Sequence, residues 1–135
     1  MRPLSRDECL DELRSHSVGR IAVTHQALPL IMPINYVLTA DAVLFRTETD
    51  GPLARACRHS VVAFEIDDLA ADGRRELSVH LVGFAELVDD QAAVRALYGR
   101  STRPQEDGHD QVVGITLGAI NGWVAIPAQA PPGGP

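Results

Sequence analysis

The sequence predicts one mainly β domain, closed or sandwich-like, with small helices at its start, middle and late positions. Two observations predict this class. Short runs of β-branched and apolar residues alternate with turn clusters, and one run is unusually long and contains a glycine. With 135 residues, 45% of them hydrophobic, the chain is long enough for one real core. We assign residues 1–126 to this domain and expect residues 127–135, rich in Pro and Gly, to be a disordered tail.

A capping box opens the chain. Ser5 and Glu8 have the S-x-x-E spacing in which the two side chains cap each other's backbone amides, so a helix is expected over Arg6–Ser15. Cys9 would lie on the inner face of this helix. Cys9 and the second cysteine, Cys57, lack the spacing of a metal or redox pair, and we interpret both as small buried hydrophobic residues.

Seven runs are expected to be strands. The first three form a meander with turn clusters at Gln26–Pro29 and Thr39–Asp41. The long run contains Gly83, and a glycine inside a long strand marks a bulge or bend of the kind that barrels need in order to close. The expected strands are Arg20–Thr24, Leu30–Leu38, Ala42–Thr47, Ser60–Ile66, Leu77–Val88, Val112–Leu117 and Ile120–Ile126.

Two more helices and two loops complete the pattern. Gly51–Arg58 has Pro52 in its first turn, where the missing N–H would be unpaired in any case. Asp89–Tyr98 opens on a capping Asp and carries apolar residues at helical spacing. The polar stretches Asp67–Arg75 and Gly99–Asp110 are expected to be loops.

The charge of the chain excludes several functions. Asp and Glu number 18 against 12 basic residues, a net charge of −6, and the sequence contains no lysine. A lysine Schiff base and a P-loop are therefore excluded. An acidic chain with 4% aromatic residues is a poor nucleic-acid binder. No apolar run approaches a membrane span and no signal peptide is visible, so we expect a cytoplasmic protein.

Motifs for other chemistries are weak. The five histidines have no metal-ligand spacing, so no metal site is predicted, and the Gly-x-Ser-x-Gly motif of triad hydrolases is missing. Glu65, Asp67 and Asp68 follow one another at a predicted strand end. They are open to two interpretations, an acid–base pair or a solvated turn, and we favour the turn.

Four segments, taken in order, carry a family resemblance. Gly19–Val23, Met32–Val37, Phe45–Thr47 and Val62–Asp67 resemble the pyridoxamine 5′-phosphate oxidase-like proteins, which are FMN-binding split barrels. The resemblance implies an antiparallel split β-barrel of six to seven strands with small flanking helices. It also implies a homodimer with cofactor clefts at the subunit interface, and an FMN-dependent oxidoreductase that transfers a hydride or electrons to an unidentified small-molecule substrate.

The resemblance also implies a cofactor site. Arg46 and Thr47 would offer a guanidinium fork and a hydroxyl to the phosphate, and Asn35 would face the ring edge. Two alternatives stay open: Asn35 and Tyr36 could only satisfy a strand edge, and Arg46 could pair with a glutamate, Glu48 or Glu65. The implied cofactor-binding residues are Ile34, Asn35, Tyr36, Arg46, Thr47, Leu53 and Ser78.

Two positions depart from the family pattern. Pro52 stands where family members commonly carry a phosphate-binding Lys, and Glu76 stands where they often carry Trp. Both changes weaken the expected attraction for a phosphate. The alternative functions are therefore a cofactor-poor module that binds a small ligand, a deazaflavin or haem, and a structural dimeric barrel that binds a protein partner.

Overall fold

The computed structural model describes residues 1–69, 75–98 and 110–125 of the chain. The expected tail, and most of the two expected loops, lie outside these residues. The described residues form three helices, α1 (Arg6–Ser15), α2 (Pro52–Ala56) and α3 (Gln91–Tyr98). The strands are β1 (Arg2–Pro3), β2 (Val18–His25), β3 (Leu28–Asn35), β4 (Val37–Leu38), β5 (Ala42–Glu48), β6 (Ser60–Leu69), β7 (Glu76–Val88), β8 (Asp110–Thr116) and β9 (Ala119–Ala125).

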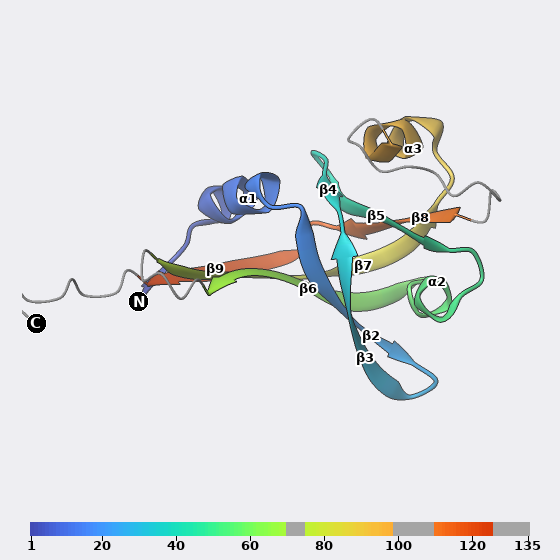
Figure 1. Ribbon diagram of the computed structural model, residues 1–135, viewed down its shortest axis with the longest axis horizontal. Helices are drawn as coiled ribbons and strands as arrows, with labels where there is room; N and C mark the ends of the chain where they lie inside the picture. Colours follow the sequence, from blue (N-terminus) through green and yellow to red (C-terminus); the bar gives the residue numbers. More distant parts are fainter. Residues whose placement is uncertain (70–74, 99–109, 126–135) are drawn as a thin grey trace, which may run out of the picture.

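The strands form one curled antiparallel sheet (Figure 1). Its order is β3-β2-β6-β7-β8-β5-β4, and β9 pairs with both β7 and β1. Helix α1 lies beside β9, α2 packs against β2 and β5, and α3 covers β5. The β2–β3 hairpin projects away from the rest of the sheet in Figure 1.

The long strand β7 changes partners along one of its edges. The first half, Glu76–Val82, pairs with β9, and the last part, Ala85–Val88, pairs with β8. Gly83 lies at the changeover, where a Cβ would stand 2.1 Å from the Thr116 carbonyl oxygen. The bend expected at Gly83 is thus a close backbone approach, and only a residue without a side chain fits there.

The core fills the inner face of the curled sheet. Alternate residues of β6 and β7 point into it, and α1 and α2 contribute Leu13 and Leu53. The Tyr36 ring meets Phe64 edge-on with centroids 4.9 Å apart, and the Tyr36 hydroxyl donates to the Leu13 carbonyl. Cys9 is buried and unpaired, as expected, and so is the second cysteine. A smaller cluster under α3 is formed by Leu44, Leu97 and Val112.

The first helix is confirmed in detail. Ser5 Oγ accepts from the Glu8 N–H at 3.1 Å, and the Glu8 carboxylate accepts from the Ser5 N–H at 3.0 Å. The capping box therefore satisfies two backbone amides that the helix leaves unpaired. Arg2 adds an ion pair to Glu8, and the pKa of this carboxyl is lowered to about 2, chiefly by the hydrogen bond from Arg2.

Two predicted strand ends and the predicted number of strands are wrong. The expected strand Leu30–Leu38 stops at Asn35 and resumes as β4, because the Tyr36 N–H bonds to the Ser17 carbonyl instead of a ladder partner. Strand β6 runs on to Leu69, so the expected loop does not begin at Asp67. The described sheet has nine strands instead of six or seven, because β1 and β4 are two-residue strands too short to leave a sequence pattern.

The first hairpin turns on two non-glycine residues. Gln26 and Ala27 connect β2 to β3 with φ of 51° and 64°. Two consecutive left-handed residues are the geometry of the two-residue turns that match the twist of paired strands. The turn sets the register His25↔Leu28, which places Arg20 and Ala22 on the face of the sheet that points away from the core.

Candidate functional site

Two neighbouring rows of side chains cross the outer face of the sheet, the face that points away from the core. The two rows are adjacent because, on each strand, the residue in one row and the residue in the other are two positions apart and point to the same face. The first row, which we call the polar row, is polar except at its first residue and runs Pro33, Arg20, Glu65, His80, Asn121 across β3, β2, β6, β7 and β9. The second is apolar and runs Ile31, Ala22, Ala63, Val82, Ala119 over the same strands.

Arg20 binds two carboxylates on the outer face. One guanidinium nitrogen donates to Glu65 Oε1 at 2.8 Å and to Asp67 Oδ2 at 2.7 Å. Burial and the neighbouring Asp67 raise the pKa of the Glu65 carboxyl above its usual range, against the opposing effect of Arg20. Two carboxylates thus share one cation, and the cluster carries one net negative charge when both are ionised.

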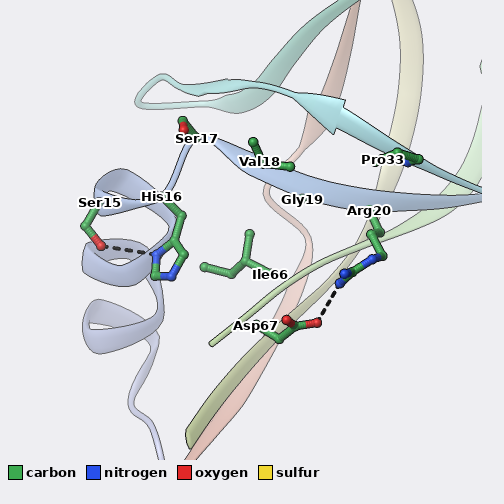
Figure 2. A pocket seen from close by; sticks show the side chains of 9 residues that line it. All are labelled: Ser15, His16, Ser17, Val18, Gly19, Arg20, Pro33, Ile66 and Asp67. Atoms are coloured by element: carbon green, nitrogen blue, oxygen red, sulfur yellow. Dashed lines mark hydrogen bonds and ion pairs between the residues drawn. The ribbon is translucent and has the colours of Figure 1, made fainter. Parts of the chain in front are cut away.

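A polar cleft opens where β2 and β6 stop pairing. Their ladder covers only Arg20–Ala22 on β2, and beyond it lies a cleft of about 450 Å³. Figure 2 shows Arg20 and Asp67 reaching toward each other across one side of this cleft, with His16 at the end of α1 on the other. His16 Nδ1 lies 2.8 Å from the Glu12 carbonyl oxygen, so Nδ1 carries the proton and Nε2 is the acceptor when the ring is neutral.

An apolar trough lies on the other side of Arg20. We call it the outer trough, and its volume is about 380 Å³. Ala22 and Ala63 lie side by side at its centre, and the larger Ile31 and Val82 stand on either side of them. Ile31 is 68% exposed and Val82 47%. The polar row closes one end of the trough with Arg20, Glu65 and His80.

An aromatic cluster borders the same face at β7 and β9. Ser78 Oγ lies 3.1 Å from His80 Nε2, and the His80 ring meets Trp123 edge-on at 6.0 Å. Trp123 is the one tryptophan of the chain and is 40% exposed. Ser78 and Trp123 are direct cross-strand partners and line a small cleft together with Glu76.

The residues expected to bind the cofactor fall into three places in a single chain. Ile34, Tyr36 and Leu53 are buried in the core, so their side chains are committed to packing. Asn35 is exposed and Ser78 half-buried on the outer face. The third place, at the end of β5, holds Arg46 and Thr47.

Arg46 has a partner that the sequence did not suggest. Its guanidinium donates to Asp110 Oδ2 at 3.1 Å, from β5 to the first residue of β8. The carboxylate of Glu65, one of the two partners considered, is held by Arg20 instead. Asp110 is only 7% exposed and Arg46 27%, so the guanidinium is held in place at the edge of the smaller core cluster.

The clustering of Glu65 and Asp67 around Arg20 was missed by sequence reasoning. The expectation that Glu65, Asp67 and Asp68 form a solvated turn is wrong, because β6 continues through them. Glu65 and Asp67 are two residues apart and therefore share one face of a strand. The spacing of the two carboxylates was visible in the sequence, but their pairing with Arg20 depends on the register of β2 against β6, which the sequence pattern does not give.

The architecture defines a class. One antiparallel sheet, curled around a core and with a long strand that divides its pairing between two partners, is a split β-barrel with small flanking helices. A FAD binding protein from Mycobacterium smegmatis shares this fold with a TM-score of 0.76 and 32% sequence identity, over 91% of this chain and 98% of that one. A conserved protein of unknown function from Corynebacterium diphtheriae matches at 28% identity and a TM-score of 0.72, over 92% and 96% of the two chains.

Sequence comparison gives the family. The pyridoxamine 5′-phosphate oxidase family matches residues 5–124, nearly the whole of the described chain, and the protein belongs to that family. An uncharacterised protein of Mycobacterium tuberculosis is 36% identical over 125 residues, which cover 88% of this chain and 82% of the relative. In the described residues no helix is both long and apolar enough to cross a membrane.

Proposed function

We propose that the protein binds the FMN moiety of a flavin nucleotide and, as a homodimer, transfers a hydride or electrons between the flavin and a small-molecule substrate. The observation that carries this proposal is the 32% identity, over 91% of the chain, to a protein that binds FAD. A bound flavin supplies the redox chemistry, and the protein supplies binding, orientation and exclusion of water.

The donor set at the end of β5 fits the phosphate arm of such a ligand. The Arg46 guanidinium is a cation that Asp110 contacts at 3.1 Å and helps to orient. The Thr47 hydroxyl is adjacent and half-buried. Pro52 adds no donor at the start of α2, so this site holds one cation fewer than the family pattern. The terminal phosphate of FMN carries a charge near −2, and the diphosphate of FAD carries about one negative charge on each phosphate, so the missing cation weakens the attraction for either flavin.

A second copy of the chain would complete the site. Val61 and Phe84 are cross-strand neighbours on the outer face, 70% and 38% exposed, one row beyond the outer trough. Exposed apolar side chains that adjoin one another in this way mark an interaction surface. A twofold dimer that buries them brings two outer faces together and encloses a cleft. The three separate groups of expected cofactor residues in one chain are consistent with a site shared between two chains.

Titration with matched ligands tests the proposal. FMN, FAD and riboflavin are each added to the flavin-free protein, and binding is followed by flavin fluorescence. Arg46→Ala should weaken FMN about 10- to 150-fold, since it removes a charge-assisted hydrogen bond to the phosphate. Riboflavin, which lacks the phosphate, should be unaffected. Pro52→Lys should tighten FMN by adding a cation while leaving the Arg46–Asp110 pair intact.

Arg55→Ala is the matched control, because it removes the same charge from an exposed position on α2. The thermal unfolding midpoint of each variant separates a lost ligand contact from a lost fold. Equal binding of FMN and riboflavin by all variants, or no binding by the parent, would contradict the proposal. The alternative ligands are then tested in turn. Deazaflavin is added to the protein, and haem is detected by a Soret band in the absorption spectrum.

A further inference from the structure

We propose that the outer trough binds a planar, cationic ring that carries no phosphate. If this ring is the substrate of the flavin reaction, that role rests on the proposed function. The binding itself is a property of Arg20, Glu65, Ala22, Ala63 and their neighbours on the outer face.

The shape of the trough selects a flat ligand. Ala22 and Ala63 are cross-strand partners whose methyl groups give a low floor two strands wide. The walls, Ile31 on β3 and Val82 on β7, are three strand spacings apart, about 14 Å. Beneath the floor lie Ile21, Phe64 and Leu81, all nearly inaccessible, so the floor is firmly packed. An aromatic ring laid on this floor buries one whole face against methyl groups.

The polar end of the trough selects the charge. Arg20 is already bonded to Glu65 and Asp67, and the shared guanidinium leaves the cluster with one net negative charge. An ionised Glu65 can accept more hydrogen bonds than the one from Arg20. His80 is the remaining titratable group at this end, directly across the strands from Glu65. A cationic N–H group at the edge of the ring would therefore donate to the Glu65 carboxylate. The Glu65 side chain is only 26% exposed, so this contact would be partly shielded from water.

The same charges exclude a phosphate from the trough. A phosphate monoester carries between −1.5 and −2 near neutral pH, and it would be placed beside a cluster of like charge. Arg20 offsets this only in part, because the two carboxylates that share its guanidinium outnumber its single charge. The phosphorylated ring after which the family is named is therefore a poor fit to this trough, and an unphosphorylated ring with an amidine or amine edge is a good one.

Three probes of equal size test the inference on the full chain without flavin. Benzamidine is a planar cation, benzamide its neutral analogue and benzoate its anionic analogue. Binding is followed by NMR of the alanine methyl groups. Benzamidine should shift the Ala22 and Ala63 methyl signals, benzamide should bind about tenfold or more weakly, and benzoate should cause no shift.

Two variants locate the interaction. Glu65→Gln keeps the shape and should weaken benzamidine about tenfold while leaving benzamide unchanged. Ala63→Leu fills the floor and should block both probes. Ala40→Leu, the same change at an exposed turn position, should have no effect. The methyl spectrum of each variant verifies that it is folded, and Ala63→Leu keeps the test valid if Glu65→Gln does not fold.

Other results overturn the inference. If benzoate bound with the same affinity as benzamidine, the trough would not select a cation. If benzamidine shifted only the signals of other alanines, its binding site would lie outside the trough. If Ala63→Leu turned a sedimenting dimer into monomers and left benzamidine binding intact, the trough would be filled by a second copy instead. Flavin binding without benzamidine binding contradicts this inference alone, and benzamidine binding without flavin binding contradicts the proposed function alone.

Discussion

The two faces of strands β6 and β7 differ sharply in how far their side chains are exposed. On the inner face Phe64, Ile66, Val79 and Leu81 are 0–1% exposed, whereas Val61 on the outer face is 70% exposed. The inner face is almost wholly apolar, whereas the outer face carries exposed apolar residues such as Val61, Val82 and Phe84 among about as many polar ones. Antiparallel sheets usually place polar residues on the side away from the core.

The difference separates residues that stabilise the fold from residues that are available for binding. The inner face has its full set of packing partners within one chain, so its apolar residues are explained by folding. The exposed apolar residues of the outer face have no such partners among the residues that the structure describes, and an exposed apolar surface of this kind marks a place where something binds. Substitutions on the two faces should therefore act on different measurements.

The largest expected effect separates the faces by stability. Phe64→Ala removes a buried ring from the core and should lower the free energy of unfolding by about 3–5 kcal/mol. Val61→Ala, three residues earlier on the same strand and facing outward, should change it by less than about 0.5 kcal/mol at protein concentrations low enough to keep the chain monomeric. Urea unfolding of the two variants measures both. Similar losses would mean that the outer face is also core.

A smaller effect tests the changeover in β7. Gly83→Ala places a methyl group against the Thr116 carbonyl, and we expect a loss of about 1–3 kcal/mol from forced backbone movement. Gly51→Ala is the control, because its nearest neighbour, the Glu48 carbonyl oxygen, is 3.2 Å from the added carbon. Thermal unfolding compares the two. An unchanged midpoint for Gly83→Ala would show that the fold does not require the close approach of Gly83 to the Thr116 carbonyl.

Helix capping should contribute less, and independently of either face. Ser5→Ala removes the acceptor for the Glu8 N–H and should cost about 1 kcal/mol in the free energy of unfolding. Flavin affinity should stay the same, because α1 begins away from the outer face. A loss of flavin binding without a loss of stability would contradict this separation.

The smallest effect is a pH dependence at the same cap. The pKa of Glu8 in the folded chain is about 2, below its value in an unfolded chain. Its stabilising contribution is therefore complete above the unfolded pKa and is lost as the pH falls toward 2. Glu8→Gln keeps the capping geometry and should be less stable than the parent near pH 6 but equal to it near pH 2. A difference that does not depend on pH would rule out the charge as its cause.

The sequence predicted the inner face well and the outer face poorly. Periodicity located all three helices and the seven longer strands, because burial of one face forces that pattern. The cluster of Arg20, Glu65 and Asp67 was not predicted, because it depends on the register of β2 against β6, which the local pattern does not determine. Arg46 was expected to be a phosphate ligand on resemblance alone, and its partner Asp110 is 64 residues away in the chain.

The labelling rate of a cysteine placed on the outer face tests most directly whether that face is a binding surface. Cys9 and Cys57 are inaccessible, and burial raises the pKa of both thiols, so Val61→Cys gives a single reactive thiol. Asp11→Cys, on the exposed side of α1, is the control. We expect a maleimide to label Val61→Cys at least about tenfold more slowly at micromolar than at low nanomolar protein, because association buries the site. The control should not change. Equal rates for Val61→Cys at both concentrations would contradict the account.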